Sequence, residues 1–254
     1  MYEYQRSCEA MATRFDVILR GTDKQHLEAV AVAVCEEIQR LDAQLSRFDK
    51  RSEIARLNRE AIAKFVRVDR ELFALLERCE QAREMANGYF DVTQCAALRL
   101  DADSRAVHLT RADAAIDLGA IGKGYALDCG REILLRYGVT SALLQGGTSS
   151  MLAIGKEAWP IAVRHPLQPE HIVARLTLTN RGLSCSGVRH AGQAESDLWN
   201  PHTGKAIGGN DACYVLAASA AEAEIYSTAL LAMGKEAAHA FLAGQSLEFA
   251  WITA

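Results

Sequence analysis

The stretch Ile116–Asp128 reads IDLGAIGKGYALD, with one lysine, Lys123, set among three glycines. Ile116 and Leu118 are typical of a strand end, and Tyr125–Tyr137 has the composition of a helix. Glycines leave room for backbone N–H groups to approach a ligand closely. A helix N-terminus attracts anions, and Lys123 adds a full positive charge beside it. The stretch therefore predicts a strand, a glycine bend and a helix that together form an anion site.

Two interpretations of this stretch stay open on its spacing alone. The pattern differs from the G-x-x-x-x-G-K-[ST] pattern of a P-loop, so an ordinary strand-to-helix turn with a surface lysine is an equal alternative. Asp117 and Asp128 bracket the lysine with carboxylates. Each carboxylate is a candidate to hold a metal, a ribose or the lysine itself.

Upstream of this stretch, the sequence predicts mainly helices. Alternation from Phe15 to Arg20 predicts a first strand. Thr22 or Asp23 can then cap a long helix whose apolar residues recur at spacings of three and four, a pattern of core residues: Leu27, Val30, Val34, Ile38, Leu41, Leu45 and Phe48. Ser52 begins a short helix, and Asp69 can cap another that ends at Gly88. That helix is expected to bury Leu72, Leu75, Leu76, Cys79 and Met85.

Downstream, strands come in runs rather than in strict alternation with helices. The expected strands are Ser141–Gln145, Met151–Ile154, Trp159–Val163, Ile172–Thr179, Ala212–Ala218 and Leu247–Ile252. A helix that stops at Gly234 and a short helix from Glu236 precede the last strand. Runs of strands favour an α+β fold over a doubly wound sheet. Because no low-complexity linker or repeat interrupts the chain, residues 1–254 are expected to form one domain.

The bulk composition narrows the functional classes. The chain has 254 residues and a formal net charge of −4, which argues against nucleic acid or an anionic membrane as a partner. No segment has the apolar run that membrane insertion needs, and the N-terminus carries charges throughout. The seven cysteines are scattered without a C-x-x-C pair, which indicates reduced thiols. These features predict a cytoplasmic protein.

Several segments, taken together, carry a family resemblance. They are Met11–Thr13 (MAT), Leu45–Asn58 (LSRFDKRSEIARLN), Gly88–Thr93 (GYFDVT), Ile116–Asp128, Gln145–Gly147 (QGG), Ser186-Gly187, Asn200–Lys205 (NPHTGK) and Ala223–Gly234 (AEIYSTALLAMG). In this order, over nearly the whole chain, they resemble the FAD:protein FMN transferases, the ApbE-like flavin transferases. The resemblance implies a single α+β, T-fold-like domain with mixed or antiparallel sheets flanked by helices.

The activity that the resemblance implies is transfer of FMN from FAD to a serine or threonine hydroxyl of a target protein. AMP is released, and the reaction uses a divalent cation, Mg²⁺. Transfer of this phosphoryl type needs an aligned nucleophile, neutralised phosphate charge and a base for the incoming hydroxyl. Magnesium suits the first two needs because it prefers oxygen ligands and keeps waters. FAD and a protein acceptor are thus the expected partners.

The resemblance also implies which residues contact FAD. They are Met11, Phe48, Tyr89, Phe90, Asp91, Asp117, Lys123 and Leu198. Phe48 stands where the family usually has a tyrosine, which would preserve stacking and lose the hydroxyl. For Asp91 the alternative is an N-cap or turn aspartate, a common role for this residue type.

The implied metal ligands lie on two segments. The backbone carbonyl of Ala120 is one, and Glu224 and Thr228 stand where the family typically has Asp and Thr. A spacing of four puts both side chains on one face of a helix. The alternative is a solvated helix face, although the neighbouring apolar residues favour a partly buried pair.

The catalytic residues are expected to be Lys123 and Asp197, and here the chain departs from the family. Asp197 replaces the family histidine that is expected to be the base, and Asn200 and Thr148 each replace an aspartate. An unperturbed aspartate is a weaker base than histidine near neutral pH. His190 and His202 are two alternative bases, each also readable as a surface histidine.

Three functions remain open at this point. The leading one is the flavin transferase. A second is an FAD pyrophosphatase, in which water replaces the protein hydroxyl and FMN and AMP are released. A third is an FAD-binding protein of the same fold with weak or lost transfer. The changes at Asp197, Asn200 and Thr148 keep the third function open.

Overall fold

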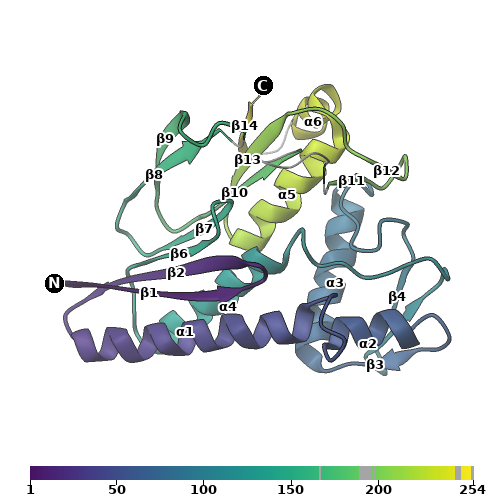
Figure 1. Cartoon of the computed structure of the whole chain (residues 1–254), viewed down its shortest axis with the longest axis horizontal. Helices are drawn as coiled ribbons and strands as arrows, with labels where there is room; N and C mark the ends of the chain where they lie inside the picture. The colour runs from purple at the N-terminus through teal and green to yellow at the C-terminus, as the bar shows by residue number, and fades with distance from the viewer. Residues whose placement is uncertain (166, 189–195, 197, 244–246, 253–254) are drawn as a thin grey trace.

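The largest element of the fold is an antiparallel sheet of seven strands (Figure 1). A computed structural model describes residues 1–165, 167–188, 196, 198–243 and 247–252. Neighbouring strands in the sheet follow the order β1 (Tyr2–Ala10), β2 (Thr13–Gly21), β6 (Ala142–Gly146), β7 (Ser150–Ile154), β10 (Gly182–Gly187), β13 (Ala212–Ala217) and β14 (Glu248–Ile252). All the pairings between them are antiparallel. The predicted α+β class with antiparallel sheets is therefore confirmed.

Each face of this sheet is covered by a different layer. Leu144 and Leu152 belong to the main core, which they form with the helices α1 (Lys24–Leu45), α4 (Gly122–Arg136) and α5 (Ala220–Met233). Leu143 and Ala153 instead pack with the hairpin β8 (Trp159–Arg164) and β9 (Ile172–Leu178). Successive residues of a strand point to opposite faces, so one strand serves both layers.

The remaining elements flank this sheet. They are α2 (Glu53–Glu60), α3 (Arg70–Met85), the three-stranded sheet β3 (Val66–Arg67), β5 (Ala106–Leu109) and β4 (Leu98–Asp101), the pair β11 (Trp199–Asn200) and β12 (Lys205–Ala206), and α6 (Lys235–Leu242). Figure 1 shows α2, α3 and the small sheet gathered beyond the C-terminal end of α1. The seven cysteines form no disulfide, as predicted.

Three of the expected helix starts are confirmed by side-chain caps. The carboxylate of Asp23 accepts from the N–H of His26 (3.1 Å). Ser52 and Asp69 cap α2 and α3 in the same way. Such caps satisfy N–H groups that have no partner inside the helix. Short-range chemistry thus fixes where these helices begin.

Two residues expected in the core are exposed. Phe48 has 81% of its surface exposed, because α1 ends at Leu45 and the Ser46 hydroxyl accepts from the N–H groups of Phe48 and Asp49 in a turn. Met85 is 58% exposed at the last position of α3. The expectation of burial was therefore wrong for both. A helical spacing predicts a face only as far as the helix continues.

Among the described residues, the structure adds seven strands that were not expected, β1, β3, β4, β5, β10, β11 and β12, and it lengthens one helix. Strand β1 pairs with β2 from Tyr2 to Ala10, at the sheet edge, and most of its residues are exposed. Its sequence therefore lacks the alternation of apolar and polar residues that predicts a strand. Helix α4 begins at Gly122, three residues before the expected start at Tyr125. In the described part of the chain, no helix has the length and apolar character to span a bilayer.

Candidate functional site

A cavity of about 660 Å³ lies where the start of α4, helix α5, strand β10 and the loop after α3 meet. We call it the central cavity. Apart from Met11, it is lined by all the residues that the resemblance implies as FAD contacts or metal ligands: Phe48, Tyr89, Phe90, Asp91, Asp117, Ala120, Lys123, Leu198, Glu224 and Thr228. Asp197 and His190 lie outside the described residues. The fold thus brings together residues that are up to 180 positions apart.

A second cavity of about 400 Å³, the side cavity, continues from the first. Met11 lines it, and Phe48, Asp117 and Lys123 line both cavities. Met11 lies in the two-residue turn between β1 and β2, where Met11 and Ala12 have φ values of 51° and 55°. Two positive φ values are typical of the type I′ hairpin turn, whose twist suits antiparallel strands.

Lys123 and Glu224 form the charged centre of the central cavity. The ammonium of Lys123 lies 3.3 Å from Oε1 of Glu224. Only 3% of Glu224 is exposed, and its Oε1 also accepts from the hydroxyl of Ser150. The N–H of Gly124 donates to its Oε2 at 2.7 Å. Three donors compensate the loss of water around this buried carboxylate.

The predicted strand, glycine bend and helix are only partly confirmed, and the strand was wrong, because Ile116 and Leu118 lie in the irregular segment between β5 and α4. Gly119 lies in the turn, where its N–H donates to Asp117 (2.9 Å). Gly122 and Gly124 instead belong to the first turn of α4. A Cβ on Gly124 would lie 2.5 Å from the carbonyl oxygen of Ala220, so this glycine serves close helix packing rather than ligand approach. The anion at this helix N-terminus is the carboxylate of Glu224.

Asp117 and the residues beside it form the wall between the two cavities. The guanidinium of Arg47 lies 3.1 Å from the carboxylate of Asp117 and 4.7 Å from the ring centre of Phe48. Arg47 lines both cavities, yet the sequence analysis assigned it no role. The available signal was its place inside the family-like segment Leu45–Asn58.

The loop Tyr89–Asp91 forms the opposite wall. Asp91 accepts from the N–H groups of Thr93 and Ala96 and from the Thr93 hydroxyl, so it holds the turn, as its alternative interpretation proposed. Phe90 is 1% exposed and belongs to the main core. The ring of Tyr89 stacks on His202 with centroids 4.1 Å apart.

His202 and Asn200 lie beside the cavity rather than in it. Nε2 of His202 contacts the carbonyl oxygen of Asn87 at 2.9 Å, and His202 lines a neighbouring hollow of about 860 Å³. Asn200 uses its amide group to bind the Ala232 carbonyl and the His202 N–H. These contacts assign turn and packing roles to both residues.

Asp128 does not face the site. Asp128 is 8% exposed, and its carboxylate accepts from the N–H groups of Ala220 and Ala221, at the start of α5. The expectation that it could hold a metal, a ribose or Lys123 was therefore wrong. Ala220 and Ala221 lie more than 90 positions away in the sequence, so no local pattern could have identified them.

Three serines of the cavity wall were not predicted as site residues. Ser149, Ser184 and Ser186 line the central cavity. The hydroxyls of Ser184 and Ser186 lie 3.0 and 2.7 Å from the hydroxyl of Ser227, beneath the wall. Single serines in strands carry no signal, although Ser186 lies in a family-like pair.

The donor set around Glu224 suits a hard cation. Ala120, Glu224 and Thr228 line one cavity and offer a carbonyl, a carboxylate and a hydroxyl. Magnesium prefers such oxygen ligands. The ammonium of Lys123 also pairs with this carboxylate, so a bound ion would share Glu224 with it. The residues present therefore fit a divalent ion.

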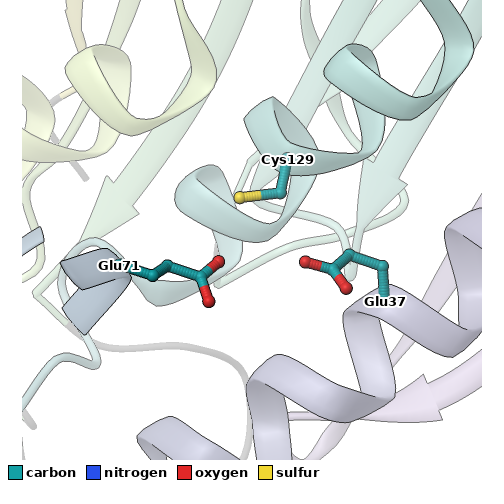
Figure 2. Close-up of side chains that lie close together, drawn as sticks. All are labelled: Glu37, Glu71 and Cys129. Carbon is teal, nitrogen blue, oxygen red and sulfur yellow. The ribbon is translucent and has the colours of Figure 1, made fainter. Parts of the chain in front are cut away.

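A different acidic cluster lies outside this site. Glu37 of α1, Glu71 of α3 and Cys129 of α4 point toward one another (Figure 2). The guanidinium of Arg40 binds both carboxylates at 2.7 Å. Burial raises the pKa of the Cys129 thiol to about 12, so this thiol stays protonated at neutral pH. The cluster is an ion-paired junction of three helices.

Comparisons with known proteins show the family and the fold of this chain. The ApbE family matches over residues 11–100 and 94–251. The FAD:protein FMN transferase of Escherichia coli K12 is 28% identical over 151 residues, which cover 56% of this chain and 43% of that protein. The FAD:protein FMN transferase of Klebsiella pneumoniae 342 is 24% identical over 248 residues, covering 83% of this chain and 78% of that protein. The match to the first of these relatives thus spans less than half of its length.

Solved structures share the fold. The ApbE protein of Thermotoga maritima superposes with a TM-score of 0.88 at 21% identity, covering 98% of this chain and 93% of that one. The flavin transferase ApbE from Vibrio cholerae gives a TM-score of 0.86 at 18% identity, with 99% and 94% covered. The family match spans nearly the whole chain, and the site lies where its matched segments converge. This chain belongs to the ApbE family.

Proposed function

We propose that this chain transfers FMN from FAD to a serine or threonine hydroxyl of a target protein and releases AMP. The observation that carries the proposal is the joint lining of one cavity by Lys123, Glu224 and Thr228, next to an apolar side cavity. The printed name of the curated relatives, FAD:protein FMN transferase, supports the same activity.

The two cavities suit the two chemical parts of FAD. Met11 and Phe48 give the side cavity an apolar surface on which an isoalloxazine ring can stack. Lys123 lies where the two cavities meet, so its charge is placed for the pyrophosphate. The central cavity then receives the AMP part, beside Tyr89 and Leu198.

The reaction forms one phosphorus–oxygen bond and breaks another. The acceptor hydroxyl attacks the FMN-side phosphorus, loses its proton, and AMP leaves with the bridging oxygen. Lys123 stabilises negative charge on the phosphates during this step. The carbonyl of Ala120, with Glu224 and Thr228, would hold Mg²⁺, which supplies further charge neutralisation when bound. Asp197 remains the proposed base, because His202 contacts Asn87 instead.

The test of this proposal is a product analysis. Purified protein is incubated with FAD and Mg²⁺, with and without fractionated cellular protein, and AMP, FMN and protein-bound flavin are measured. AMP together with covalent flavin on a protein supports transfer. AMP with free FMN identifies the pyrophosphatase, and FAD bound without AMP release identifies the binding protein.

Lys123→Ala should weaken FAD binding by about 1–3 kcal/mol, the range of a charge-assisted hydrogen bond. The physical reason is the loss of one positive charge at the pyrophosphate. Titration followed by flavin fluorescence measures the change. Lys24→Ala, at the exposed start of α1, is the control and should leave affinity unchanged. If both variants bound FAD with the same affinity, the pyrophosphate of FAD would not bind at Lys123.

Phe48→Ala should weaken FAD binding without lowering the melting temperature. The side chain is 81% exposed in the described structure, so its loss leaves the core intact. An aromatic stacking contact contributes about 0.5–1.5 kcal/mol beyond its buried area. Leu135→Ala removes another exposed apolar side chain, 50% exposed on α4, and serves as the control. A lower melting temperature with unchanged FAD affinity would contradict the stacking role.

A further inference from the structure

Helices α4 and α5 bind each other's N-termini with carboxylates. Asp128 of α4 accepts from the N–H groups of Ala220 (2.9 Å) and Ala221 (3.2 Å), the first two residues of α5. Glu224 of α5 accepts from the N–H of Gly124 (2.7 Å), in the first turn of α4. A negative charge at each helix N-terminus is favourable because the helix dipole is positive there.

The two contacts repeat one spacing. Asp128 lies four residues after Gly124, and Glu224 lies four residues after Ala220. Four residues advance a helix by about 6 Å, slightly more than one turn. Gly124 and Ala220 each donate one of these hydrogen bonds, and their backbones touch so closely that a Cβ on Gly124 would overlap the Ala220 carbonyl. Two carboxylates and one backbone contact therefore fix the position of one helix along the other.

A third helix holds Asp128 in place. The guanidinium of Arg78, on α3, lies 3.6 Å from Oδ2 of Asp128 and donates to the Ser219 hydroxyl at 2.9 Å. Ser219 in turn caps α5 by accepting from the N–H of Glu222. Asp128 is thus oriented by an ion pair and has no contact with either cavity of the site.

We propose that Asp128 is the positioning residue that fixes α5 against α4, and so places Glu224 and Thr228 opposite Ala120 and Lys123. This inference rests on the proposed function, in which those residues hold Mg²⁺ and phosphate. Glu224 lies one turn from the amide groups that Asp128 binds. A shift of α5 along α4 therefore moves its carboxylate relative to Lys123 and to the Gly124 N–H.

The test compares Asp128→Asn with Glu132→Gln. Both variants remove one negative charge from α4 and keep the side-chain shape, but Glu132 is 66% exposed and contacts Arg131. FAD binding is followed by flavin fluorescence while Mg²⁺ is titrated. For D128N we expect the half-saturating Mg²⁺ concentration to rise about tenfold, as for the loss of a partner that orients a metal ligand. For E132Q we expect no shift.

Hydrogen exchange of single amides provides a second readout that needs neither FAD nor activity. In D128N, exchange should accelerate at Ala220 and Ala221, and also at Gly124, because the two contacts hold one helix position. Faster exchange confined to Ala220 and Ala221, or an unshifted Mg²⁺ midpoint with only a smaller bound fraction, would overturn the inference. If the wild type neither binds FAD nor releases AMP, the proposed function fails, and exchange at Gly124 still decides the role of Asp128.

Discussion

Glu224→Gln should lower AMP release by about 100-fold at a fixed Mg²⁺ concentration, which corresponds to about 2.7 kcal/mol. The carboxylate is 3% exposed and is shared by Lys123, Gly124 and Ser150. An amide retains one acceptor oxygen but has no charge for Lys123 or a metal, and it turns an NH₂ group toward other donors. Removing one partner of a buried charged pair is strongly destabilising.

Two further variants make this result specific. Glu236→Gln removes an exposed charge from the first turn of α6 and should leave AMP release unchanged. Glu224→Asp keeps the charge and restores the residue that the family typically has, so Mg²⁺ dependence should be retained. Its shorter side chain should weaken the contact with the Gly124 N–H. If E224Q responded to Mg²⁺ like the wild type, Glu224 would not be a metal ligand.

Gly124→Ala should lower the free energy of unfolding by about 1–3 kcal/mol, the usual cost of overpacking a well-packed core. A Cβ at this position would lie 2.5 Å from the Ala220 carbonyl oxygen and 2.7 Å from the Cα of Ala221. Both are backbone atoms of α5, so no side chain can rotate away to make room. The overlap is removed only if α5 shifts, and that shift would also weaken Mg²⁺ binding by Glu224 and Thr228. Urea unfolding measures the loss of stability.

Gly122→Ala is the matched control, two residues earlier in the same helix. Its Cβ would lie 3.8 Å from the sulfur of Met11, an ordinary contact distance. Alanine is favoured over glycine in helices by up to about 1 kcal/mol, so G122A should be neutral or stabilising. Equal unfolding free energies for G122A and G124A would show that α5 does not restrict position 124.

Local sequence chemistry accounts for the parts of the fold that were predicted correctly. Caps such as Asp23, Ser52 and Asp69 act within three residues, so they can be read without knowing the fold. The apolar stripe of α1 is buried as far as Leu45. Periodicity predicts which face of an element is buried, but not its partner or its end. This limit explains the exposed Phe48, whereas the edge strand β1 was missed because most of its residues are exposed and show no alternation.

The sequence by itself determined the α+β class, the starts of α1, α2 and α3 and, through the family-like segments, the residues that line one cavity. Only the tertiary structure decided what several of them do. Glu224 meets Gly124 across 100 positions, and Asp128 meets Ala220 across 92. The glycines of the opening stretch looked like room for a ligand, yet Gly124 makes room for another helix. Such contacts depend on how helices pack, and local spacing carries no information about the element on the other side.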